Sequence, residues 1–291
     1  MKAIRQLARH GVLSSLAAVD AVLSREKLIG EQKIVQVVNF HHLYAREQDP
    51  FRKFLKWFKE NYQVVSYSEA AERIITGQID GAYGAITFDD GLKSIVEAGK
   101  ILAEFDISAA FFVCPSIVGE TDPTRLRQFC DQAKMYYESD EFANWSELAE
   151  LKRLKHEIGN HTFTHPELAA KSIDVVNEEI SNAQQVLVRE LGDTRHFAWP
   201  LGKFNNLGQS AAQALSNFNF YSIASGERGA HILEPMDPNC MTLPCIRRDN
   251  LEARWPLSHL RYFLIRNALS PVKREQWWLN GWDISKNTIQ K

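Results

Sequence analysis

Short apolar runs alternate with longer amphipathic stretches from Ile34 onward, and this alternation restricts the folds open to the chain. A short apolar run bounded by turn residues predicts a buried strand, whereas apolar residues spaced three and four apart predict a helix. Strands that alternate regularly with helices indicate βαβ units and a parallel sheet. The predicted strands are numerous enough to close into a barrel, so we expect an α/β fold.

The predicted elements fill most of the region between residues 34 and 224. The strands are Ile34–Phe40, Gln63–Ser66, Tyr83–Phe88, Ala109–Val113, Glu157–Asn160, His196–Trp199 and Phe220–Ala224. The helices are Phe51–Asn61, Tyr67–Thr76, Leu92–Phe105, Ser146–Lys155, Ile173–Leu191 and Leu207–Ser216. The segment Pro115–Phe142 is polar and weakly periodic, so we expect an extended loop on the rim of the barrel.

The two ends of the chain fall outside this alternation and divide it into three parts. We assign residues 1–33 to an N-terminal helical extension, 34–250 to the barrel, and 251–291 to a C-terminal helical and tryptophan-rich extension. Apolar residues recur at helical spacing in both extensions. They are Ile4, Ala8, Val12, Leu16, Val19 and Leu23 in the first, and Leu257, Leu260, Phe263, Leu264 and Leu269 in the second, which Trp277, Trp278 and Trp282 follow.

Both extensions are basic, which leaves two interpretations open. A basic helix with an apolar face and clustered tryptophans fits a peripheral membrane segment. The same residues fit helices that pack on each other, on the barrel or on a partner. The net charge of the whole chain is −2, which argues against nucleic acid as its main partner. Asp20 interrupts the first apolar stretch, which makes a poor secretion signal, so we expect a cytoplasmic protein, either free or at the inner membrane face.

Adjacent carboxylates follow one predicted strand. Asp89 and Asp90 come directly after the apolar run that ends at Phe88, and Gly91 follows them. Carboxylates at the end of a buried strand are costly unless something uses their charge. Barrel enzymes keep their active sites at the carboxyl ends of the strands. The pair therefore marks a candidate catalytic site, although a turn in which Asp90 caps the next helix fits equally well.

Two histidines four residues apart follow another predicted strand. His161 and His165 stand in the run Asn160-His161-Thr162-Phe163-Thr164-His165. A histidine pair at this spacing, taken alone, is more often exposed or hydrogen-bonded than metal-binding. Two histidines and one carboxylate, however, form a catalytic metal site with open positions. The presence of Asp89 and Asp90 therefore favours a metal site.

These motifs resemble those of the polysaccharide deacetylase family, which is also called the NodB homology domain or carbohydrate esterase family four. The resemblance rests on Thr87-Phe88-Asp89-Asp90-Gly91 followed by Gly159-Asn160-His161-Thr162 and His165. Further segments are similar to the family's first strand, its tryptophan-led helix, its third motif and its late strand. These segments are Val38–His42, Trp145–Leu148, Phe197–Gly202, and Leu243-Pro244 with Ile246-Arg247.

The resemblance implies a fold, a cofactor and a set of residue roles. It implies a distorted (β/α) barrel of about seven parallel strands. It makes Asp90, His161 and His165 the ligands of one divalent metal ion, for which we expect Zn²⁺. It makes Asp89 the general base. This division agrees with the chemistry, since a divalent ion lowers the pKa of bound water and polarises an amide carbonyl.

The chain departs from the family pattern at two motifs. Ala198 stands where the third motif usually has an arginine that orients the base, and Leu243-Pro244-Cys245 stands where a histidine supplies the general acid. The general acid is therefore unassigned, and His41, His42 and His231 are its candidates. Trp199 and Pro200 belong to the third motif and are candidates for substrate binding.

The resemblance implies a carbohydrate substrate, and the leading function is removal of an N-acetyl group from an amino sugar. The sugar would belong to a glycan, a lipid-linked sugar or an oligosaccharide. Metal chemistry on another substrate is an alternative: a sugar deformylase, an O-acetyl esterase or a cyclic-amide hydrolase. A catalytically silent carbohydrate-binding relative is a second alternative, suggested by the missing arginine and histidine.

Overall fold

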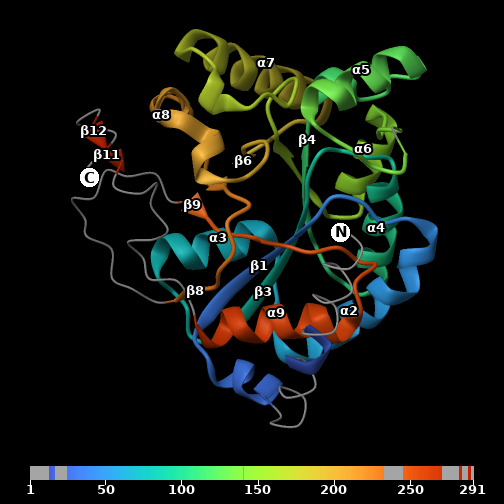
Figure 1. The fold of residues 1–291 in the computed structure, drawn as a ribbon, viewed down its shortest axis with the longest axis vertical. Coiled ribbons are helices and arrows are strands. Elements are labelled where there is room, and N and C mark those ends of the chain that lie inside the picture. The colour runs from blue at the N-terminus through green and yellow to red at the C-terminus, as the bar shows by residue number, and fades with distance from the viewer. Residues whose placement is uncertain are drawn as a thin grey trace.

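The computed structural model describes residues 13–16, 25–139, 141–232 and 245–270, and two short strands at 282–283 and 288–289. Its main feature is a curled sheet with helices around it (Figure 1). Across the sheet the order is β10 (Asp249–Asn250), β1 (Ile34–Phe40), β3 (Ala82–Phe88), β4 (Ala110–Val113), β5 (Glu157–Asn160), β6 (His196–Ala198), β7 (Ser222–Ala224) and β9 (Cys245–Ile246). Every pairing along this path is parallel, and the predicted distorted barrel is confirmed.

The two edges of the sheet are joined by a very short piece of chain. Strand β9 pairs with β7 at one edge, and β10 pairs with β1 at the other. Only Arg247 and Arg248 separate β9 from β10 in the sequence. We call residues Cys245–Asn250 the seam of the barrel. Two other short strands lie off the main path: β2 (Gln63–Val64) pairs with β3, and β8 (His231–Ile232) runs antiparallel to β1.

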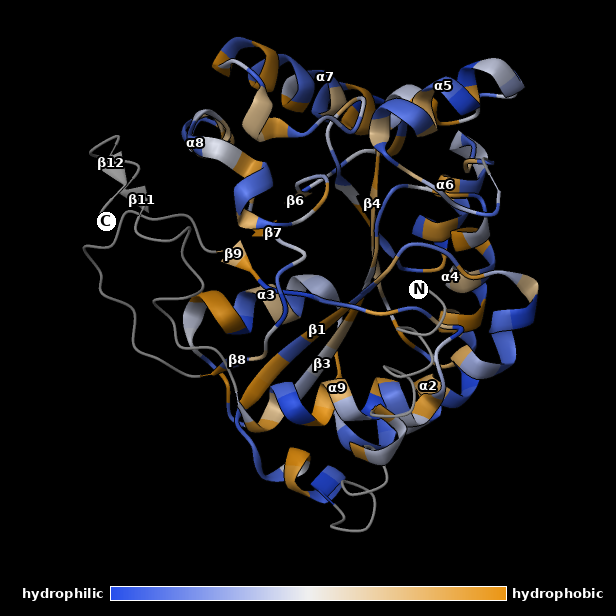
Figure 2. Cartoon of the chain, viewed as in Figure 1, coloured by the Kyte–Doolittle hydropathy of each residue, from blue (hydrophilic) through white to orange (hydrophobic). Residues whose placement is uncertain are grey.

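Hydrophobic packing explains the position of the central strands. Every residue of β1 and of β3 is buried, and Figure 2 shows hydrophobic residues gathered along β1 and β4. Strands covered on both faces are expected to be mainly apolar, and β1 and β3 are, with Gln36, Asn39 and Thr87 as buried polar exceptions. The helices around the sheet are α2 (Gln48–Asn61), α3 (Tyr67–Thr76), α4 (Ser94–Glu104), α6 (Trp145–Arg153), α7 (Ile173–Leu191) and α8 (Phe204–Leu215), with short 3₁₀ turns η1 (Arg25–Glu31), η2 (Ala45–Glu47), η3 (Pro115–Ile117) and η4 (Leu168–Ala170).

The segment Pro115–Phe142 is not the extended loop that we expected. It contains an eleven-residue helix, α5 (Pro123–Ala133), whose first turn is capped by the side chain of Asp122. Leu126, Phe129 and Ala133 of α5 pack in a small hydrophobic cluster with residues such as Phe142. Asp before Pro is a helix-start signal, and these apolar residues have helical spacing, so the sequence contained the information.

The described part of the C-terminal extension packs on the barrel. Helix α9 (Leu257–Leu269) contacts α2, η1 and β1, and it buries Leu260, Leu264 and Ala268. Leu16, at 40% exposure, is the member of the N-terminal stripe that falls within the described residues. The rest of that stripe, Trp277, Trp278 and the side chain of Trp282 lie outside them. In the described part of the chain, no helix has the length and apolar content needed to span a bilayer.

Candidate active site

The site lies at the carboxyl ends of neighbouring strands. Asp89 and Asp90 follow β3, His161 follows β5 and His41 follows β1. Asp90 and Gly91 have positive φ values of 74° and 84°. This left-handed turn brings both carboxylates to one pocket, although side chains of successive strand residues would point to opposite faces. A Cβ on Gly91 would lie 3.2 Å from the side chain of Val113, so glycine suits this turn for two reasons.

Three buried side chains converge on one point. The Nε2 atoms of His161 and His165 each lie 3.3 Å from Oδ1 of Asp90. One ligand atom from each residue lies within 4.8 Å of the others, and the three residues form the group of potential metal ligands found in the described part of the chain. Positive φ values at Thr162 (66°) and His165 (59°) fold the second histidine back toward the first.

The hydrogen bonds around this group suit metal binding. His161 Nδ1 lies 2.8 Å from the carbonyl oxygen of Ala198. Because a carbonyl only accepts, Nδ1 carries the proton and Nε2 keeps its lone pair for a cation. Burial alone would raise the pKa of Asp90, but the adjacent imidazoles of His161 and His165 hold it well below the usual value. Two imidazoles and one carboxylate, with positions left for substrate, fit a catalytic zinc ion.

A buried arginine holds the second carboxylate. Arg248 Nη1 and Nη2 lie 2.7 and 2.8 Å from the two carboxylate oxygens of Asp89, in a bidentate ion pair. Asn39 Nδ2 donates to the same carboxylate at 3.0 Å. Burial would raise the pKa of Asp89, but the charges of Arg248 and His161 lower it. Asp89 is therefore held as an anion with a defined orientation.

The role of Arg248 was not predicted from the sequence. The family's usual position for a base-orienting arginine, in the third motif, holds Ala198, which is buried on β6. Arg248 comes from the seam, is fully buried, and also donates to the carbonyl of Ser225 at 2.8 Å. The only signal in the sequence was the pair Arg247-Arg248 directly after the apolar residues Cys245-Ile246.

The three histidines considered as general acid lie in different surroundings. His41 lines the pocket together with Asp89, Asp90, His161 and His165. His42 is absent from that lining: its Nδ1 pairs with Glu47 at 3.1 Å and its ring stacks on Tyr44. The structure also places His231 away from the pocket, on β8 beside Val35 at the amino end of β1. There burial lowers the pKa of His231 to about 3.

Trp199 and Pro200 of the third motif do not line the pocket either. Trp199 is fully buried, and its indole N–H donates to the carbonyl of Lys203 at 3.0 Å. It packs in a hydrophobic cluster with Leu168 and Leu207, and Pro200 beside it is buried as well. The chain turns at Leu201, whose φ is 63°, and this turn directs Leu201 and Gly202 to the pocket in place of Trp199 and Pro200.

The pocket is small and is closed on one side by the segment after α5. Its volume is about 100 Å³, and its lining includes Ala133, Lys134, Met135 and Tyr137. The hydroxyl of Tyr137 donates to Oδ2 of Asp90 at 2.5 Å. Burial and the neighbouring Asp90 raise the pKa of Tyr137, which keeps this hydroxyl protonated. Part of the segment expected on the rim thus contacts the carboxylate of Asp90 directly.

Comparisons with known proteins agree with this geometry. Residues 78–218 match the family model described as polysaccharide deacetylase. Among solved structures, the chain is similar to the Streptococcus pyogenes deacetylase PplD in complex with acetate, with a TM-score of 0.60, 18% identity, and coverage of 80% of this chain and 98% of that one. It is also similar to IcaB from Ammonifex degensii, with a TM-score of 0.61, 20% identity, and coverage of 81% and 97%. At these identities the structural likeness supports the fold.

Proposed function

Because the chain belongs to the polysaccharide deacetylase family over residues 78–218, we propose that the protein is a metal-dependent hydrolase that removes an N-acetyl group from an amino sugar. One observation carries the proposal. Asp90, His161 and His165 converge as metal ligands in a buried pocket that also contains Asp89, held as an anion by Arg248. A silent binding relative would not need this combination of ligands and base.

The bound cation would supply Lewis acidity, polarising the amide carbonyl and making water easier to deprotonate. The remaining steps belong to the chain. A water molecule attacks the carbonyl carbon while Asp89 accepts its proton. Arg248 keeps Asp89 charged and oriented during this transfer. The C–N bond then breaks, and the departing amine takes up a proton, which gives acetate and a free amino sugar.

We propose that His41 donates this proton to the departing amine. Among the titratable residues that line the pocket, Asp90, His161 and His165 serve as ligands and Asp89 as base. Lys134 is paired with Glu167 at 2.8 Å, and its side chain is largely exposed. The Tyr137 hydroxyl is engaged with Asp90. His41 follows β1 directly, so its position is set by the strand beside the two aspartates.

The test measures the product released by the zinc-loaded protein from matched substrates. We expect acetate from an N-acetylhexosamine oligosaccharide, loss of activity with a chelator, and recovery when Zn²⁺ is returned. Asp89→Asn is the control for contaminating activity. Activity confined to an N-formyl sugar, an O-acetyl ester or a cyclic amide would move the protein to the alternative substrate class. Sugar binding without metal or hydrolysis would support the silent relative.

The cellular location and membrane contact are further proposals. We propose a cytoplasmic protein whose basic ends contact an anionic membrane surface, because Lys and Arg near such a surface each contribute about 1 kcal/mol. Co-sedimentation with anionic vesicles, compared with neutral vesicles and with a chain lacking residues 1–30, tests this contact. Equal sedimentation with both vesicle types would contradict it.

A further inference from the structure

The segment Lys134–Phe142 crosses from α5 to α6 and is held at both ends. Met135 and Phe142 are buried in the hydrophobic cluster of α5. Between them, the backbone N–H of Glu138 donates to the hydroxyl of Tyr44 at 3.0 Å. The carboxylate of Glu138 also accepts from Arg46 Nη1 at 2.7 Å. These contacts fix the segment beside the pocket.

Tyr137 projects from this segment to a metal ligand. Its hydroxyl donates to Oδ2 of Asp90, whereas Oδ1 of the same carboxylate faces the Nε2 atoms of His161 and His165. The two carboxylate oxygens therefore have different partners, Tyr137 for Oδ2 and the two imidazoles for Oδ1. Rotation of the carboxylate would break the bond to Tyr137 and move Oδ1 away from the imidazoles at the same time.

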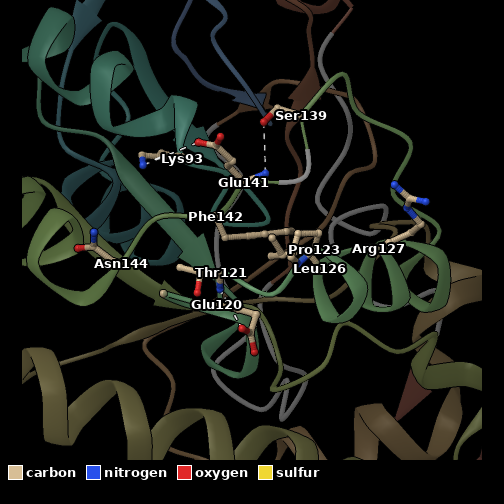
Figure 3. A pocket seen from close by; sticks show the side chains of 11 residues that line it. Lys93, Glu120, Thr121, Pro123, Leu126, Arg127, Ser139, Glu141, Phe142 and Asn144 are labelled. Carbon is tan, nitrogen blue, oxygen red and sulfur yellow. Dashed lines mark hydrogen bonds and ion pairs between the residues drawn. The ribbon is translucent and has the colours of Figure 1, made fainter.

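A second hollow lies beside the later residues of the segment. A hollow of about 510 Å³ is lined by Ser139, Glu141 and Phe142 of the segment, together with Lys93 and Leu126. Figure 3 shows Glu141 turned toward Lys93 and Phe142 beside Leu126. The hollow shares no lining residue with the pocket at Asp89. The segment thus lines two separate spaces: Lys134, Met135 and Tyr137 line the pocket, and Ser139, Glu141 and Phe142 line the hollow.

We propose that Tyr137 is a positioning residue for the metal site. Through its hydrogen bond to Oδ2 it fixes Asp90 so that Oδ1 faces both imidazoles. Full metal affinity therefore requires the segment Lys134–Phe142 to stay in its position beside the pocket. The proposal rests on the proposed function for the existence of the metal site. Hydrogen bonds to the groups that bind a metal commonly change metal affinity about tenfold to a hundredfold.

The experiment measures zinc affinity by competition with a chromogenic chelator. Tyr137→Phe should weaken zinc binding about tenfold, with unchanged unfolding of the metal-free protein. Tyr136→Phe is the matched control, since Tyr136 is 82% exposed, and should bind zinc like the wild type. Glu138→Ala removes the exposed pairing with Arg46 and should weaken zinc binding by no more than about fivefold.

The outcomes separate this proposal from the proposed function. Wild-type affinity in Tyr137→Phe overturns the positioning role and leaves the metal site intact. A loss in Glu138→Ala with Tyr137→Phe unaffected also overturns it, because the effect then belongs to the segment and not to the hydroxyl. A wild-type protein that binds no zinc overturns both.

Discussion

The sheet has a histidine and carboxylate cluster near each end of its strands, and the two clusters use their histidines differently. At the amino ends, both ring nitrogens of His196 have side-chain partners: Nδ1 lies 2.8 Å from Ser222 Oγ, and Nε2 lies 2.8 Å from Ser68 Oγ. Glu157 completes this group, with Oε2 3.2 Å from His196 Nε2. At the carboxyl ends, the Nε2 atoms of His161 and His165 converge on one oxygen of Asp90.

The backbone conformation also differs between the two clusters. Asp90, Thr162, His165 and Leu201 all have positive φ at the carboxyl edge. Such conformations are costly for residues other than glycine and gather where a site requires them. The amino-end cluster consists of strand and helix residues that hydrogen-bond one another. Burial of a histidine beside a carboxylate therefore does not identify a catalytic site. The candidate site differs from the amino-end cluster in that two ring nitrogens converge on one carboxylate oxygen, from a backbone with positive φ.

The largest effect should come from the base. Asp89→Asn should lower kcat about a hundredfold to ten-thousandfold, because the amide cannot accept a proton from water. Its zinc content should stay near the wild-type level, since Asp89 is not among the three converging ligands. Asp90→Asn should instead lose zinc. Measurement of kcat and bound metal on both variants checks this division, and equal zinc loss in the two would contradict it.

The next largest effect should come from the general acid. His41→Gln should lower kcat on an N-acetyl amide about a hundredfold, because the leaving amine lacks its proton donor. Hydrolysis of an aryl acetate should change little, since an aryloxide leaves without protonation. His42→Gln is the matched control, because His42 pairs with Glu47 outside the pocket lining. Equal losses in the two variants would remove the role assigned to His41.

A smaller effect on activity should follow removal of the buried arginine. Arg248→Gln should lower kcat about tenfold to a hundredfold through misplacement of Asp89. It should also lower the free energy of unfolding by about 3–5 kcal/mol, because one charge of a buried pair loses its partner. Kinetics and urea unfolding check both effects. If Arg247→Gln, on the neighbouring half-buried residue, behaved identically, the loss would reflect the seam in general.

The smallest effect on activity should come from the amino-end cluster. Glu157→Gln should leave kcat unchanged and reduce stability at neutral pH by about 1–3 kcal/mol. Although burial would raise it, the pKa of Glu157 is lowered by hydrogen bonds from His196 and Ser68. The stabilisation is therefore present above the unfolded pKa of about 4.3 and is lost as the pH falls through the folded value.

Thermal unfolding across pH tests this sign. The difference in Tm between wild type and Glu157→Gln should be largest near neutral pH and should shrink below about pH 4. Ser139→Ala, on the rim segment and far from this cluster in the sequence, serves as the control. A difference in Tm that grew toward acid pH, or a loss of kcat, would break the distinction between the two ends of the barrel.

The sequence predicted the strands and helices that have a regular apolar pattern. Strand β1 and helices α3 and α7 have the predicted bounds, since each has a clear apolar pattern, and the four-residue strand β5 has its predicted bounds as well. The seam strands β9 and β10 contain two residues each, too few to show a period, so apolar periodicity did not predict where the barrel closes.

The same limit applied to the site. Asp90, His161 and His165 stood out as a motif, whereas Arg248 meets Asp89 across 159 residues of sequence. Its role depends on where the seam lies in space. His41 and His42 could not be separated either, because the direction of a side chain beyond a strand end depends on the turn that follows.

The seam should also be the first part of the sheet to open when the protein is heated. Strands β9 and β10 are the shortest links of the main sheet, and Arg248 between them holds the carboxylate of Asp89, the proposed base. Regions with few backbone hydrogen bonds open locally at a lower free energy than the core. Opening of the seam would release Asp89 while β1, β3 and β4 remained folded. We therefore expect heat inactivation to precede cooperative melting, with fast amide exchange at residues 245–250 as its first sign.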